Sequence, residues 1–201
     1  MANHVNNHIQ VEEISEEGQK VWDSFVERIE ALPDAGHLTG LFYEADKEGY
    51  WIVPEGVHAS EAVGAKWAFA RELDFCYINV ESAWAAVIPL VDHIAQEIGK
   101  VDPDVLISLQ YEDEMPNFVG VATFNCDGLD TDNDCSYEEL REFIFNKEPE
   151  LREKWDEDEE DWIEEDRDDI DLYMEVEDEF YRCVWEEVET WQIDNKEWSI
   201  K

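Results

Sequence analysis

Residues 104–125 read DVLISLQYEDEMPNFVGVATFN, and this stretch decides the fold class. In the segments 104–112 and 118–124, apolar or small side chains recur at every second position, which is the pattern of strands that bury one face. The residues between the two segments include Pro116 and are typical of a turn. The stretch therefore predicts two neighbouring strands of a β-sheet.

A helix is predicted directly upstream of this pair of strands. Ser82 is a suitable N-cap, and Gly99 and Pro103 are typical of a helix end. The apolar residues between these limits recur at helical spacing: Ile88, Val91, Ile94, Ala95 and Ile98. Two further strands, 65–72 and 75–81, are predicted before the helix, with a tight connection between them.

The N-terminal part of the chain adds one strand and one helix. An extended stretch covers residues 4–13, and an amphipathic helix follows it and ends at Pro33. Residues 34–63 contain several glycines and a proline, and they predict an irregular loop with short strands at 41–44 and 50–53.

The predicted element order of residues 1–127 is β-α-β-β-α-β-β. This order is typical of an α+β protein, and in particular of a ferredoxin-like sandwich that has two helices on one face of a single sheet and one extra edge strand. We predict a ferredoxin-like α+β domain over residues 1–127 and a mostly helical, acidic C-terminal extension over residues 128–201.

Five short segments occur in the order and at the spacing of a known protein family. They are MANHVNNHIQV (1–11), GAKW (64–67), SAW (82–84), YEDE (111–114) and FVG (118–120). Through these segments, residues 1–125 resemble a phage- and plasmid-borne family of unknown function that carries a YubB-type ferredoxin-like domain. The resemblance implies that fold and an origin in a mobile genetic element, and it supplies no catalytic residues. Beyond Gly120 the sequence departs from the family, so the resemblance says nothing of the acidic extension.

The extension has the pattern of folded helices. Ser136 and Glu139 form a capping box that starts a helix, and Pro149 interrupts this helix. Farther on, apolar residues recur every four positions, at Val176, Phe180, Val184 and Val188. A helix with such an apolar face is expected to pack on the sandwich or against a second copy of the chain, so a homodimer is among the expected assemblies.

Negative charge is the most unusual property of the chain. Asp and Glu number 54 against 14 Lys and Arg, which gives a formal net charge of −40. Nucleic acid repels such a polyanion, so direct nucleic-acid binding is excluded. No apolar run of about 18 residues is present for a membrane span, the N-terminus lacks a secretory signal, and the cysteines are scattered as in a reducing compartment. These features predict a cytoplasmic protein, in the host cytoplasm if a phage encodes it.

More than half of the charge excess lies in residues 130–189, which hold 28 acidic and 6 basic side chains. Carboxylates held rigidly at close spacing can occupy a site built for phosphates. We therefore predict a mimic of DNA or RNA that inhibits or regulates a basic host nucleic-acid-binding protein, such as a nuclease, a restriction or CRISPR effector, a polymerase or a nucleoid protein. The predicted contact residues come from the densest segment: Asp156, Glu157, Asp158, Glu159, Glu160, Asp161, Glu164, Glu165, Asp166, Asp168, Asp169 and Asp171.

A second hypothesis places a metal site between Asp127 and Glu138, in a divalent-metal-binding module or a metal-assisted enzyme. Three carboxylates there alternate as at the start of a calcium loop: Asp130, Asp132 and Asp134. The sixth and twelfth positions of that loop hold Cys135 and Arg141 in place of glycine and glutamate, so an Asp- and Asn-rich turn before a helix is the simpler interpretation.

Two further interpretations stay open at the level of sequence. The aromatic-rich extension would suit a structural phage protein that assembles through this segment, and a solvated charge run would serve solubility alone. The sequence contains no phosphate-binding loop, dinucleotide fingerprint, nucleophile elbow or His-Glu-x-x-His motif. The leading prediction is therefore a binding protein, not an enzyme, without a cofactor.

Overall fold

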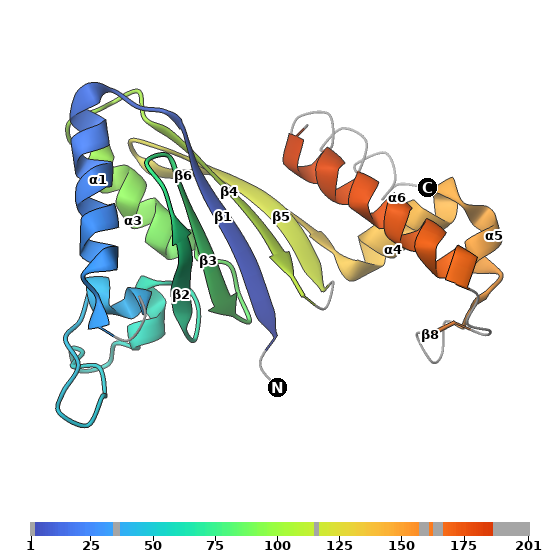
Figure 1. Cartoon of the computed structure of the whole chain (residues 1–201), viewed down its shortest axis with the longest axis horizontal. Coiled ribbons are helices and arrows are strands. Elements are labelled where there is room, and N and C mark those ends of the chain that lie inside the picture. Colours follow the sequence, from blue (N-terminus) through green and yellow to red (C-terminus); the bar gives the residue numbers. More distant parts are fainter. Residues whose placement is uncertain (1–2, 34–36, 115–116, 157–160, 163–166, 187–201) are drawn as a thin grey trace. The chain divides into compact units, whose positions relative to one another are not determined.

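The computed structural model divides the chain into two compact units (Figure 1). The sheet unit comprises the described residues up to 114 together with 120–132. The helical unit comprises 117–119 and the described residues from 133 onward. The residues that the structure describes are 3–33, 37–114, 117–156, 161–162 and 167–186.

Six strands form one sheet in the order β2-β3-β1-β4-β5-β6, so that β2 and β6 are its edges. Strand β1 lies between β3 and β4 and is antiparallel to both, and β2 is antiparallel to β3. The strands are β1 (His4–Glu13), β2 (Ala68–Leu73), β3 (Tyr77–Ala83), β4 (Leu106–Asp113), β5 (Phe118–Asn125) and β6 (Gly128–Ser136).

Two helices, α1 (Glu16–Glu30) and α3 (Ile88–Gly99), lie side by side on one face of this sheet (Figure 1). Their apolar stripes are buried, and Trp22 and Ile94 are fully inaccessible to solvent. Each large side chain buried in this way contributes about 1.5–3 kcal/mol to folding. The core of the sheet unit therefore lies between these helices and the sheet.

Side chains of β1 point alternately to the two faces of the sheet. One face is buried under the helices, and we call the other the open face. Val5 and Ile9 are buried, whereas His4 and His8 on the opposite face are half-buried. Because register is shared across paired strands, the same division continues into β3, where Glu81 lies opposite Asn6 on the open face. The open face is where polar side chains from several strands meet.

Aromatic packing holds the helical unit together. Its elements are α4 (Tyr137–Lys147), α5 (Pro149–Arg152), β7 (Trp155–Asp156), β8 (Asp161–Trp162) and α6 (Arg167–Glu186). The rings of Phe143 on α4 and Phe180 on α6 have centroids 4.9 Å apart. The rings of Trp155 and Tyr173 are stacked, with centroids 6.2 Å apart. The capping box of Ser136 and Glu139 starts α4, as the sequence predicts.

The α+β class and most of the regular elements agree with the sequence analysis, and three predictions are wrong. The helix predicted from Ser82 begins later, because β3 continues to Ala83 and α3 starts at Ile88. In place of strands at 41–44 and 50–53, there is one isolated bridge between Ala45 and Trp51. The 3-10 helices η1 (Leu38–Leu41) and η2 (Ala59–Ala62) supply the regular structure of this loop.

The third wrong prediction is the turn between Asp127 and Glu138. Residues 128–136 form the edge strand β6 instead. Asp and Asn disfavour strands in general, yet charged residues are common on edge strands because they discourage pairing with other chains. Only the aspartates signalled a turn, and their tolerance at a sheet edge explains the error.

Candidate functional site

The predicted contact residues fall into three groups in the structure. Seven of them lie outside the described residues: Glu157, Asp158, Glu159, Glu160, Glu164, Glu165 and Asp166. Asp156 and Asp161 are paired across the short β7–β8 ladder. Asp168, Asp169 and Asp171 lie in the first turns of α6. The dense acidic segment is therefore not one continuous helix, because strands β7 and β8 precede α6.

Helix α6 has an apolar face and, on its opposite side, an acidic face. Val176, Phe180 and Val184 are buried. On the opposite side, three exposed acids follow each other at spacings of four and three residues, which places them in one line along the helix: Asp171, Glu175 and Asp178. We call these three residues the α6 stripe. The contact set predicted from the sequence ends at Asp171 and lacks Glu175 and Asp178, although the four-residue apolar period implies an acidic face opposite.

Two of the predicted acids near the start of α6 take part in interactions. Both carboxylate oxygens of Asp169 lie 2.5 Å from Lys154 Nζ, and the Asp169 side chain is 15% exposed. Asp168 also takes part in an interaction. The three acids of the α6 stripe, by contrast, are exposed, so their charge is available to a partner.

The charge density of the α6 stripe is lower than that of a duplex. From Asp171 to Asp178 the helix rises about 10.5 Å, so the three acids follow at intervals of about 5 Å. B-DNA carries one charge per about 1.7 Å of axis. One helix face thus reaches about a third of that density, and a close match to a duplex requires more than one acidic element.

Helix α1 of the sheet unit carries an acidic line of the same spacing. Asp23, Glu27 and Glu30 are exposed and are again separated by four and three residues. The fold therefore displays carboxylates on both units. This second line offers a matched comparison for any test of the α6 stripe.

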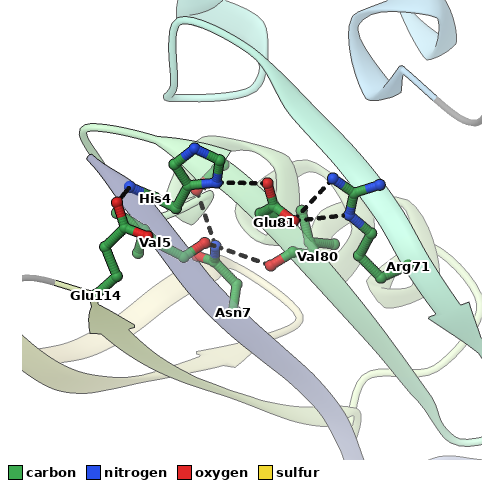
Figure 2. A network of polar contacts seen from close by, with 8 residues as sticks. His4, Val5, Asn7, Arg71, Val80, Glu81 and Glu114 are labelled. Atoms are coloured by element: carbon green, nitrogen blue, oxygen red, sulfur yellow. Dashed lines mark hydrogen bonds and ion pairs between the residues drawn. The ribbon is translucent and has the colours of Figure 1, made fainter. Parts of the chain in front are cut away.

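A polar network that sequence reasoning missed lies where β1 begins (Figure 2). The imidazole Nδ1 of His4 is 2.6 Å from Glu81 Oε1. Arg71 donates to the other oxygen of Glu81, from Nε at 2.9 Å and from a terminal nitrogen at 2.8 Å. Burial opposes ionisation of Glu81, but the hydrogen bonds from His4 and Arg71 outweigh it and lower the pKa of this carboxyl.

The buried amide of Asn7 forms the second part of this network. Its Nδ2 lies 2.9 Å from the Val5 carbonyl oxygen, 3.2 Å from that of Val80 and 2.8 Å from Ser82 Oγ. Its Oδ1 accepts from the Val87 amide at 3.0 Å. One side chain therefore ties β1 and β3 to the start of α3. These contacts depend on strand register, which no local sequence pattern reveals.

The carboxylates proposed as metal ligands do not converge on one point. Asp130, Asp132 and Asp134 occupy alternate positions of the extended strand β6. Asp132 accepts a hydrogen bond from Tyr111 Oη at 2.7 Å, and Asp130 accepts from Asn125 Nδ2 at 3.2 Å. Across the described ranges, no group of three or more His, Cys, Asp or Glu is disposed to hold a metal ion.

Within the same ranges, no helix has the length and apolar character needed to cross a bilayer.

Comparison with known proteins returns no relative for this chain. A scan against protein-family models finds no matching family, and searches of curated proteins and of solved structures find no match. The resemblance to the YubB-type family stays a prediction, and the chain is placed by its α+β architecture alone.

Proposed function

We propose that this protein binds a basic protein at the surface where that partner would otherwise hold nucleic acid. In this proposal it is a phage-type inhibitor or regulator, and its partner is a host nuclease, restriction or CRISPR effector, polymerase or nucleoid protein. In this proposal the protein acts by binding its partner and does not catalyse a reaction. The homodimer stays a prediction, and the size of the protein in solution tests it.

The observation that carries the proposal is the α6 stripe. Three exposed carboxylates stand in one line while the opposite face of the helix is buried, so the acids have fixed positions on a folded scaffold. The net charge of −40 leaves far too few basic residues to neutralise them internally. Fixed, uncompensated carboxylates attract Lys and Arg side chains and speed the encounter with a basic partner.

We also infer that the sheet unit has the topology of a ferredoxin-like sandwich. Strand β1 leads through α1 to β2, and β3 leads through α3 to β4. In the sheet, β3 separates β2 from β1, and β1 separates β3 from β4. These interleaved β-α-β units support a ferredoxin-like sandwich with two further strands, β5 and β6, beside β4.

Capture from a bacterial lysate tests the function. The immobilised protein is expected to retain a basic nucleic-acid-binding protein at low salt and to release it as salt rises from about 50 to about 200 mM. Duplex DNA added during capture should compete for the retained protein. Reversal of the stripe in the triple variant D171K/E175K/D178K should weaken binding about 100-fold, because three attractions and the three repulsions that replace them, at about 0.5 kcal/mol each, change the binding free energy by about 3 kcal/mol.

A matched variant separates the stripe from total charge. D23K/E27K/E30K changes the net charge by the same amount on α1, at the same residue spacing. If this variant loses binding as strongly as the α6 variant, bulk charge rather than the α6 surface is responsible. Retention of a partner that DNA does not displace would contradict nucleic-acid mimicry.

A further inference from the structure

Residues 44–52 form a short hairpin in the loop between η1 and η2, and we call it the 44–52 hairpin. The Asp46 amide donates to the Tyr50 carbonyl oxygen at 2.8 Å. The Asp46 carboxylate closes the turn, because its Oδ1 accepts from the amides of Glu48 and Tyr50 at 2.8 and 2.9 Å. Gly49, with a φ of 89°, supplies the left-handed residue of the turn. The tip of the hairpin therefore has a defined conformation.

Ring contacts attach one side of this hairpin to the sheet unit. The ring centroids of Trp51 and His37 are 5.1 Å apart, and those of His37 and Phe69, on the edge strand β2, are 4.7 Å apart. A Cβ placed on Gly40 of η1 would lie 3.6 Å from the indole of Trp51. Trp51 thus packs on both β2 and η1, and it holds the hairpin in one position.

The two neighbours of Trp51 leave apolar surface in water. Tyr50 is 71% exposed and Ile52 is 60% exposed. Successive side chains of extended backbone point to opposite sides, so both lie on the side away from the one that Trp51 packs. A Cβ placed on Gly49 would meet no atom of the described chain within 4 Å, so the tip stands clear of the fold. One exposed apolar residue is ordinary, whereas two on the same side of a fixed arm are typical of a contact surface.

Charge around the tip indicates which kind of partner fits it. Residues 44–55 include four acidic side chains and one lysine. Glu44, Glu48 and Glu55 are exposed, so carboxylates flank the two apolar side chains along the chain. An apolar centre with a charged rim is the usual anatomy of a protein interface, and a rim of this sign attracts Lys and Arg.

We propose that Tyr50 and Ile52 insert into an apolar pocket of the basic protein partner, whose Lys and Arg side chains surround that pocket. The inference rests on the proposed function and adds an apolar contact to the charged one at the α6 stripe. Buried apolar contacts govern how slowly a complex dissociates, whereas exposed charges govern how its affinity depends on salt. A second copy of this chain is not the occupant, because its net charge of −40 would oppose the acids of the hairpin.

The variant Y50T/I52T removes the apolar surface and keeps residues that suit extended backbone, so Tm should not change. Its affinity for the protein that the wild type retains at low salt, once purified, should fall between about 10-fold and 100-fold. The slope of affinity against salt should equal that of the wild type, whereas the α6 stripe variant should have a shallower slope. Phe75→Thr is the matched control, because Phe75 is 72% exposed in the β2–β3 turn, outside the hairpin.

Photo-cross-linking locates the contact directly. Benzoylphenylalanine in place of Ile52 should cross-link to the retained basic protein in the lysate when it is irradiated. The same probe in place of Phe75 should give no such product, although that position is equally exposed.

The outcomes separate this inference from the proposed function. Normal affinity in Y50T/I52T, an equal loss in Phe75→Thr, or no cross-link from position 52 overturns the inference, even if the α6 stripe variant fails to bind. A lower Tm in Y50T/I52T also overturns it, since the two side chains would then be packing residues. A cross-link between two copies of the chain, or binding to neutral lipid vesicles through the hairpin, assigns it another occupant and overturns it. If position 52 cross-links to a protein that duplex DNA does not displace, the hairpin contact stands and nucleic-acid mimicry falls.

Discussion

Asp102 joins the loop before β4 to the first turn of α1. Its carboxylate accepts from the Ser15 amide at 2.5 Å and from the Asp104 amide at 3.2 Å, and the residue is 3% exposed. The hydrogen bond from the Ser15 backbone outweighs the opposing effect of burial and lowers the pKa of Asp102. The ionised carboxylate therefore stabilises the folded state.

Asp102→Asn should lower the free energy of unfolding by about 1.5–3 kcal/mol at neutral pH, because a charged acceptor for the Ser15 amide is lost. The folded-state pKa lies below the unfolded value of about 3.9, so the contribution is complete above that value. It disappears as pH falls through the lower folded-state pKa. Urea titrations from neutral pH to below about 4 should show the two proteins converging. Asp104→Asn, at an exposed neighbour, should behave like the wild type.

Single residues mark the limit of what the sequence predicts about the site. The capping role of Ser136 and the buried apolar positions follow from local pattern, and they are confirmed. The contact between His4 and Glu81 joins residues 77 positions apart, so it depends on how β1 and β3 align. Positive φ at Trp84 is equally invisible, because local pattern would place glycine or asparagine there.

At the level of elements, the contact between α4 and α6 determines whether the acids of α6 have fixed positions. Phe180 is 1% exposed and packs against Phe143. Phe180→Ala should destabilise the helical unit by about 3–5 kcal/mol through lost burial and a residual cavity. Hydrogen exchange should then accelerate along α6 and remain unchanged in β1. Phe180→Leu should cause a smaller change, and equal acceleration in β1 would show that the two units unfold together.

Amphipathic helices and buried strands were predictable because each has one periodic apolar face. The pattern of Val176, Phe180 and Val184 defined α6 although the surrounding residues are strongly acidic. Strand β6 and the β7–β8 pair lacked such a face. These strands depend on pairing with neighbouring strands and on the sheet edge, which tolerates aspartate. The spacing of apolar residues therefore gave no signal for them.

At the scale of the whole molecule, the acids that attract a partner also repel each other. A net charge of −40 raises the free energy of the compact state, since folding brings the carboxylates together. Salt screens this repulsion, as the Debye length falls from about 30 Å at 0.01 M to about 8 Å at 0.15 M. Stability and partner binding should therefore respond to salt in opposite directions.

We expect Tm to rise by several degrees over this range of salt, while affinity for a basic partner falls. Differential scanning fluorimetry measures the first, and a binding titration at the same salt concentrations measures the second. The α1 variant D23K/E27K/E30K has a net charge of −34, since each reversal adds two charges, so it should melt higher at low salt and depend less on salt. It should still bind the partner, because the α6 stripe is intact. A Tm that does not change with salt would mean that repulsion between the acids does not destabilise the fold. The acidic excess would then have no energetic cost that a binding function has to explain.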